Sequence, residues 1–221
     1  MSRTGPLKIA VLVSGRGSNL QALIDACKDP GFPAEIVCVL SNRPDAYGLE
    51  RARQAGIPAV VVDHKQHRDR PSFEAALNEA LAPFAPELIC LAGFMRILTE
   101  DFTNHWRDRM INIHPSLLPA FRGLHTHERA IESGVRVSGC TVHYVRPEMD
   151  DGPIIIQAAA PVLPDDTPDT LAARILELEH KIYPEAVRLI ALSKIRVEGQ
   201  RVVFAEPYDH PGALINPEPG A

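Results

Sequence analysis

The fold class follows from one stretch of the sequence, Leu7-Lys8-Ile9-Ala10-Val11-Leu12-Val13-Ser14-Gly15-Arg16-Gly17-Ser18-Asn19. It opens with an apolar run rich in β-branched side chains, which is typical of a buried strand. The run stops at a glycine-rich turn, and apolar residues then recur with the helical period at Leu20, Leu23, Ile24 and Cys27. The spacing of Ser18 and Gln21 matches a capping box and predicts a helix capped by the serine.

Strand-like and helix-like segments go on alternating along the first half of the chain. Further strands are predicted at 36–40, 59–62, 88–91 and 110–113, and helices at 46–55, 71–81 and 99–106. This alternation predicts an α/β fold with a mostly parallel, twisted, Rossmann-like sheet and helices on both faces. The C-terminal half predicts an antiparallel portion at 137–145 and 154–162, a helical stretch at 168–192 interrupted by Pro184, and a hairpin at 195–204.

Length and composition indicate one globular domain. The 221 residues are 45% hydrophobic and 23% charged, which excludes a disordered or fibrous chain. We expect a single domain over residues 1–221, with a core at about 7–192 and a C-terminal hairpin and loose tail at 193–221.

Charge and hydropathy exclude several classes of partner. The formal charge of −5 disfavours nucleic acid as a partner, because nucleic-acid-binding proteins are usually basic. No apolar run reaches the length of about 18 residues that a membrane span needs. The N-terminus lacks the apolar region and the cleavage site of a signal peptide, which predicts a cytoplasmic protein.

Cysteines and histidines do not predict a metal site. The four cysteines lack any C-x-x-C spacing and are interpreted as small buried hydrophobic residues. His125-Thr126-His127 could offer two metal ligands from an extended segment, with His143 nearby in sequence. No further residue completes a zinc set, so helix capping or substrate contact is the preferred role for this segment.

Residues that follow the predicted strands matter most, because parallel sheets bind ligands beyond the carboxyl ends of their strands. In the loop Gly15–Asn19, glycines permit a tight turn, and the free N–H groups at the start of the next helix attract an anion. Leu20 replaces the third glycine of the dinucleotide fingerprint, and no Walker lysine follows. The loop therefore predicts a site for a monophosphate, and the alternative is a turn without a ligand.

Asn112 and His114 are two residues apart at the end of a predicted strand, which places them on the same side. An amide and an imidazole side by side can donate hydrogen bonds to a developing oxyanion, and the imidazole can also carry a proton near neutral pH. An acid from the segment 148–153 could orient the imidazole and favour its charged form. The alternatives are a polar strand end and an ordinary acidic turn.

Five motifs together resemble those of the phosphoribosylglycinamide formyltransferase family, within the folate-dependent formyltransferase superfamily. They cover approximately residues 7–192, and the motif around Asn112 and His114 is shared across the superfamily. In order, they are Ser14-Gly15-x-Gly17-Ser18-Asn19-Leu20, Leu91-Ala92-Gly93-Phe94-Met95-Arg96-Ile97-Leu98, Asn112-Ile113-His114-Pro115-Ser116-Leu117-Leu118-Pro119, Gly123-Leu124-His125-Thr126-His127 and Asp150-x-Gly152-Pro153-Ile154.

The resemblance implies a single-domain, Rossmann-like formyltransferase fold and a one-carbon transferase. Its members transfer the formyl group of 10-formyltetrahydrofolate to the amine of glycinamide ribonucleotide in de novo purine (IMP) biosynthesis, through a tetrahedral intermediate and without a metal. Asn112, His114 and Asp150 would then be the catalytic group.

The resemblance also implies the binding residues. Gly17, Ser18 and Asn19 would hold the substrate phosphate, and Glu179 would lie near the glycinamide. Leu176 stands where the family often has a polar residue. Arg146-Pro147 also departs from the family pattern, in the loop that would close over the folate. Folate-binding residues would be Arg70, Met95, Arg96, Ile97, Leu98, Arg146, Pro147, Glu148 and Met149.

Three alternatives stay open. A formyltetrahydrofolate hydrolase would use the same catalytic group on water, but it usually carries an N-terminal regulatory domain, for which we expect no room before Leu7. A methionyl-tRNA formyltransferase would need a C-terminal RNA-binding domain and a basic surface. A non-catalytic nucleotide-binding module would need only the phosphate loop. The sequence is compatible with a monomer or a homodimer.

Overall fold

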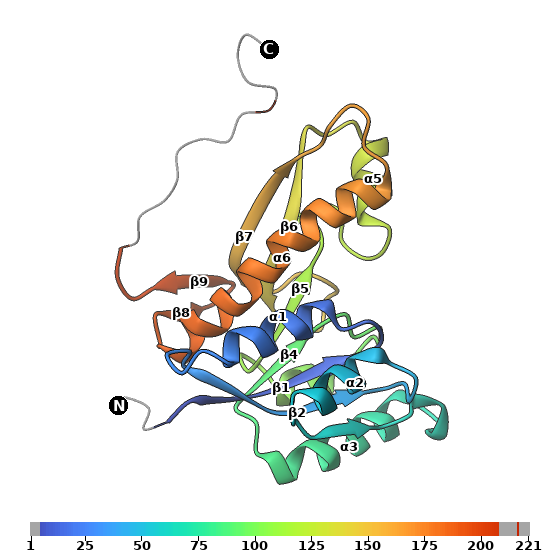
Figure 1. Cartoon of the computed structure of the whole chain (residues 1–221), viewed down its shortest axis with the longest axis vertical. Helices are drawn as coiled ribbons and strands as arrows, with labels where there is room; N and C mark the ends of the chain where they lie inside the picture. Colours follow the sequence, from blue (N-terminus) through green and yellow to red (C-terminus); the bar gives the residue numbers. More distant parts are fainter. Residues whose placement is uncertain (1–4, 208–215, 217–221) are drawn as a thin grey trace.

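The computed structural model describes residues 5–207 and residue 216. Within them, seven strands form one sheet in the order β3-β2-β1-β4-β5-β6-β7 (Figure 1). Strands β1 to β5 pair in parallel, and β6 and β7 add the predicted antiparallel portion. Their bounds are β1 (Leu7–Val13), β2 (Ala34–Ser41), β3 (Ala59–Val61), β4 (Leu88–Leu91), β5 (Met110–His114), β6 (Val137–Tyr144) and β7 (Ile154–Pro161).

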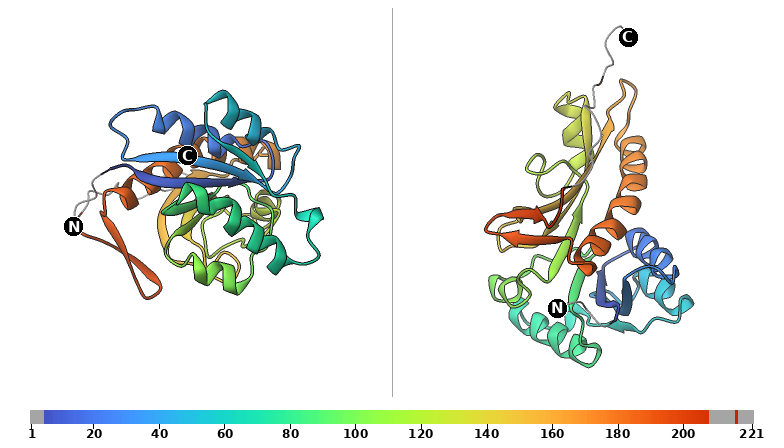
Figure 2. Two further views of the ribbon diagram at one scale, coloured as in Figure 1. Left: turned by 90° about the horizontal axis from the view of Figure 1, so that it is seen from below. Right: turned by 90° about the vertical axis from the view of Figure 1, so that its left-hand side faces the viewer.

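Helices cover both faces of the sheet, as predicted (Figure 2). Alternate residues of β1 explain this, because Ile9 and Val11 belong to one apolar cluster with α1 and α6, whereas Ala10 and Leu12 belong to a second cluster with α3 and α4. The helices are α1 (Ser18–Cys27), α2 (Tyr47–Gln54), α3 (Arg70–Leu81), α4 (Glu100–His105), α5 (Thr126–Glu132) and α6 (Pro168–Ala191), with short 3₁₀ helices η1 (His64–Gln66) and η2 (Ala82–Phe84).

The start of α1 differs from the predicted capping box. Gly17, not Ser18, is the N-cap residue, and it has a left-handed conformation with φ 70° and no side-chain cap. A Cβ atom on Gly17 would lie only 2.8 Å from the Cα of Gly48, at the start of α2. The close approach of these two backbones therefore sets the turn, and the prediction of a serine cap was wrong.

Helix α6 continues through Pro184, so the predicted interruption was wrong. A proline inside a helix removes one backbone hydrogen bond and costs about 3 kcal/mol. Next to it, Tyr183, Ala186 and Val187 are completely buried against the sheet. Burial of large apolar side chains contributes about 1.5–3 kcal/mol each, which offsets the missing bond.

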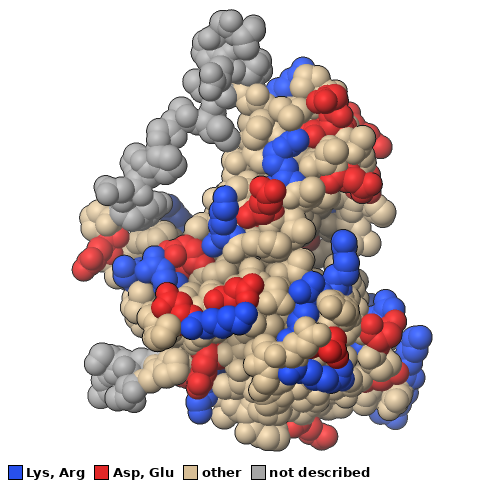
Figure 3. Space-filling view, viewed as in Figure 1, with Lys and Arg blue, Asp and Glu red and all other residues tan. Residues whose placement is uncertain are grey.

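The C-terminal hairpin is confirmed, with β8 (Ile195–Glu198) and β9 (Arg201–Phe204) joined through Gly199. Most of the predicted loose tail lies outside the described residues. On the face drawn in Figure 3, acidic and basic side chains are interspersed. Within residues 5–207, no helix combines the length and apolarity that crossing a bilayer requires.

Candidate active site

The register of β5 and β6 builds the centre of the site. Asn112 pairs with His143 and His114 pairs with Thr141, at the carboxyl end of the parallel strand β5. The amide Nδ2 of Asn112 lies 3.4 Å from Nε2 of His143. The side chains of Asn112, His114 and His143 thus lie where parallel sheets bind their ligands.

Asp150 reaches this group from the loop that joins β6 to β7. Its Oδ2 lies 3.5 Å from Nδ1 of His114, and its Oδ1 lies 3.9 Å from Nε2 of His143. The carboxylate also accepts a hydrogen bond of 2.8 Å from the backbone N–H of Gly123. The structure therefore brings Asp150 to Asn112 and His114, from which it is distant in the sequence.

His143 joins this group as a neutral acceptor. Its Nδ1 donates to the carbonyl of Tyr144 at 2.9 Å, which leaves Nε2 to accept from Asn112. Burial lowers the pKa of His143 to about 4. The neutral imidazole therefore fixes the orientation of the Asn112 amide. Sequence reasoning gave His143 only as a neighbour, because the register of two antiparallel strands cannot be derived from spacing.

His114 is also buried, but its second nitrogen faces a loop. Nε2 of His114 lies 3.0 Å from the carbonyl oxygen of Phe121 and donates to it. Phe121 has a left-handed backbone with φ 52°. The two nitrogens of His114 thus face different partners, Nδ1 the carboxylate of Asp150 and Nε2 a carbonyl of an irregular loop.

A cavity of about 150 Å³ opens beside Asn112 and Asp150. Of the predicted folate residues, Arg96, Ile97, Leu98 and the segment 146–149 line it. Met95 does not, since its side chain is 68% exposed. Arg70, exposed at the start of α3, does not line it either. The remaining lining residues are Leu91, Phe94, Thr103, Asn112, His143, Val145 and Asp150.

Arg146 is held by the protein itself. Its Nη2 donates to Oδ1 of Asp108 at 2.5 Å, and its Nη1 donates to the carbonyl of Val145 at 3.0 Å. The side chain is buried, so this ion pair anchors the base of the loop that carries Asp150. Arg146, which departs from the family pattern in this loop, is therefore held by Asp108.

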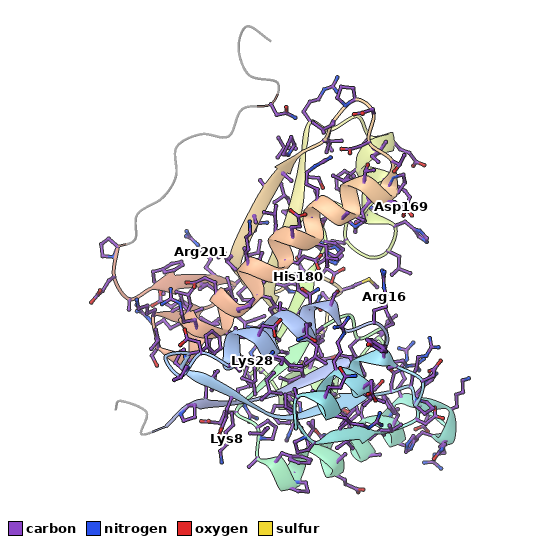
Figure 4. All side chains as sticks on the ribbon, in the orientation of Figure 1. Lys8, Arg16, Lys28, Asp169, His180 and Arg201 are labelled. Carbon is purple, nitrogen blue, oxygen red and sulfur yellow. The ribbon has the colours of Figure 1, made fainter. Side chains whose placement is uncertain are left out.

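Asn19 and Glu179 meet on the other side of the site. Nδ2 of Asn19, on α1, donates to Oε2 of Glu179, on α6, at 2.7 Å. Burial raises the pKa of Glu179. Oδ1 of Asn19 is buried without a partner, so the free atom of this amide is an acceptor. In Figure 4, Arg16 lies ahead of α1, and His180 lies on the neighbouring α6.

The first turn of α1 leaves backbone N–H groups without helical partners. The first intrahelical bond here runs from the N–H of Gln21 to the carbonyl of Gly17. The preceding N–H groups, of Ser18, Asn19 and Leu20, have no partner inside the helix. An anion at this end would meet backbone donors and not the Asn19 side chain.

The His125-Thr126-His127 segment begins α5, with His125 at the N-cap position. His125 precedes α5, a helix that the sequence analysis did not predict, and makes no side-chain cap bond. His127 is half-buried, and burial lowers its pKa. Among the described residues, no group of three or more His, Cys, Asp and Glu side chains could hold a metal ion.

Residues 7–187 match the family model described as formyl transferase. The chain belongs to the formyl transferase family. It is 46% identical to phosphoribosylglycinamide formyltransferase of Haemophilus influenzae over 191 residues, covering 86% of this chain and 90% of the relative. Among solved structures, glycinamide ribonucleotide transformylase 1 from Symbiobacterium toebii has a TM-score of 0.89 and 48% identity, covering 92% of this chain and 96% of that one.

Longer relatives share the same domain. The formyl transferase is 50% identical over 195 residues to the trifunctional purine biosynthetic protein adenosine-3 of Gallus gallus, covering 88% of this chain. The chain spans only 19% of the length of that relative.

Proposed function

We propose that this formyl transferase moves the formyl group of 10-formyltetrahydrofolate to the amine of glycinamide ribonucleotide, in de novo purine (IMP) biosynthesis. One observation carries the proposal: Asn112, His114 and Asp150 converge beside a cavity that Asn112 and Asp150 line. Relatives named phosphoribosylglycinamide formyltransferase support the same assignment.

In the proposal, the cavity receives the pterin ring of the folate. Aliphatic side chains of Ile97, Leu98 and Val145 supply apolar walls, and Arg96 and Arg146 lie among the lining residues. The catalytic amide of Asn112 and the Asp150 carboxylate border the same space. In the proposal, Met95 and Arg70 contact the more exposed benzoyl-glutamate part of the folate, in keeping with their exposed positions.

On the nucleotide side, the backbone N–H groups of Gly17, Ser18 and Asn19 are proposed to bind the phosphate. The mild overall acidity of the chain gives no long-range attraction, so this helix start must attract the anion locally. The acceptors Glu179 and Asn19 Oδ1 suit donors of the substrate, such as hydroxyl or amide N–H groups.

Formyl transfer needs a new bond from the amine nitrogen to the formyl carbon and loss of the bond from that carbon to N10. Asn112 donates from Nδ2, held in place by His143, to the oxygen that becomes negative when the amine attacks. His114 donates from Nε2 after releasing Phe121. Asp150 faces Nδ1 of His114 and stabilises the charged imidazole.

A proton must also move from the attacking nitrogen to the leaving N10. Charged His114, buried beside Asp150, can give its proton to N10 and then take the proton that the amine nitrogen releases, directly or through a water molecule. The side chains required for the transfer are thus Asn112, His114 and Asp150. The chemistry calls for neither a metal nor a covalent enzyme intermediate.

An assay with 10-formyltetrahydrofolate, with and without glycinamide ribonucleotide, tests the proposal. We expect folate turnover only when the acceptor is present. Equal turnover without the acceptor would favour the hydrolase, and no turnover with either mixture would favour a nucleotide-binding module.

We further propose that residues 1–221 form one formyl transferase domain, with a core at about 7–192 and the C-terminal part at 193–221. A cytoplasmic location and a monomeric or homodimeric state belong to the same proposal. Sedimentation of the purified chain would distinguish the two states.

A further inference from the structure

Ser14 connects the two loops that the proposed function assigns to the two substrates. It directly follows β1, next to the loop Gly15–Asn19, and is 5% exposed. Its N–H donates to the carbonyl of Gly93 at 3.2 Å, and its Oγ accepts from the N–H of Met95 at 2.7 Å. Both contacts are to the segment 93–98, which supplies one wall of the cavity.

The hydroxyl proton of Ser14 fixes a third element. It points to Oδ1 of Asn42, at 2.5 Å, directly after β2. Asn42 is 2% exposed, and its carbonyl accepts from Nδ1 of His64 at 2.8 Å. One hydroxyl thus donates once and accepts once, and it joins the ends of β1 and β2 to the loop after β4.

Segment 93–98 makes few other backbone hydrogen bonds among the described residues. It lies outside helices and strands, between β4 and α4. Within the described residues, its backbone hydrogen bonds run to Ser14 alone, through the carbonyl of Gly93 and the N–H of Met95. The flanking bonds belong to Ala92, which donates to Leu12, and Thr99, which donates to Glu74. The path of the cavity wall therefore depends on this serine.

We propose that Ser14 is a positioning residue for formyl transfer. It holds the wall of the folate cavity at a fixed distance from the phosphate-binding loop, so that formyl carbon and amine meet in a reactive geometry. This inference rests on the proposed function for the identity of the two substrates. Displacement of reacting groups by about 1 Å can cost on the order of 10² in rate, so a single hydroxyl can matter.

Ser14→Ala removes the acceptor of Met95 and the donor to Asn42. We expect kcat/KM for the formyl donor to fall by about 10- to 100-fold, while KM for the nucleotide stays within about twofold. Ser41→Ala is the matched control. Ser41 is a fully buried serine at the end of β2, and its hydroxyl accepts from the N–H of Arg43 at 3.0 Å rather than touching either loop. It should lose stability without this kinetic change.

Amide hydrogen exchange, measured by NMR on ¹⁵N-labelled protein, tests the contact without any activity. We expect the Met95 amide to exchange at least about tenfold faster in Ser14→Ala, while Ala92, bonded to Leu12 at 2.9 Å, keeps its protection. Ser14→Thr retains the hydroxyl and should restore both readouts.

Three results would overturn the inference: an unchanged Met95 amide, equal kinetic losses in Ser14→Ala and Ser41→Ala, or unchanged kcat/KM for the formyl donor in Ser14→Ala. If Ser14→Ala does not fold, Asn42→Ala carries the same exchange and kinetic tests, since it removes the acceptor of the Ser14 proton. If the wild-type chain does not transfer formyl groups, the proposed function fails, and the exchange result still decides whether Ser14 holds the segment.

Discussion

His114 and His143 flank the same carboxylate and yet are prepared for different tasks. Both are buried, and one nitrogen of each faces Asp150, at 3.5 Å and 3.9 Å respectively. The other nitrogen of His143 donates to the carbonyl of Tyr144 within its own strand, whereas that of His114 donates to Phe121 in a loop.

This difference shows how position decides the role of an imidazole. His143 cannot exchange its bond to Tyr144 without distorting β6, and burial keeps its pKa at about 4, so it acts as a fixed acceptor. The bond from His114 ends on a loop residue with a left-handed backbone, which a substrate oxygen can replace. His143 orients Asn112, and His114 is the one to which the proposed function gives a contact with the substrate.

Among substitutions that test this comparison, His114→Ala should have the largest effect on turnover. We expect turnover to fall on the order of 10²–10³, because one of two donors to the oxyanion is removed. Calorimetry should show nearly unchanged nucleotide affinity, since the N–H groups of α1 are untouched. Near wild-type turnover would refute the catalytic assignment of His114.

Asp150→Asn should have the next largest effect. A carboxylate beside an imidazole favours the charged form of the imidazole. Removing the charge 3.5 Å from His114 should therefore lower turnover by about 10-fold or more. Unchanged turnover in a steady-state assay would mean that Asp150 does not act through His114.

Of the three substitutions, His143→Gln should have the smallest effect. We expect to see this effect in the free energy of unfolding. The pKa of His143 in the folded chain is about 4, below its ordinary 6.5, so the unfolded chain binds the extra proton first on acidification. The free energy of unfolding should fall between about pH 6.5 and pH 4, by up to about 3 kcal/mol from this group.

Urea unfolding at several pH values in this window checks the prediction. The glutamine variant should show a shallower fall than the wild type, because it cannot bind that proton. If the free energy of unfolding fell equally with pH in the two proteins, burial of His143 would not be the cause of the fall.

The sequence was sufficient for the parts of the fold that depend on local patterning. Apolar runs and helical periods gave the alternation of the first half, the antiparallel portion and the C-terminal hairpin. Strand ends also indicated where polar side chains would gather, and Asn112, His114 and Asp150 do lie together. The motifs that named the family lie on the loops at this edge.

What the sequence could not give depends on contacts between distant residues. The turn before α1 is set by Gly48, and the continuity of α6 through Pro184 is set by burial against the sheet. His143 depends on strand register, and the partner of His114 depends on an irregular loop around Phe121.

The contact between Gly17 and Gly48 has one more consequence. A side chain on Gly17 would collide with the backbone of α2, and a Cβ on Gly48 would lie 3.0 Å from Cγ2 of Val13, so the loop is confined between a helix and a strand. Ordering a residue of backbone costs about 1–2 kcal/mol in conformational entropy, and here that cost is met when the chain folds. A phosphate arriving at α1 would encounter donors that are already immobile, so its binding free energy would not be reduced by ordering them.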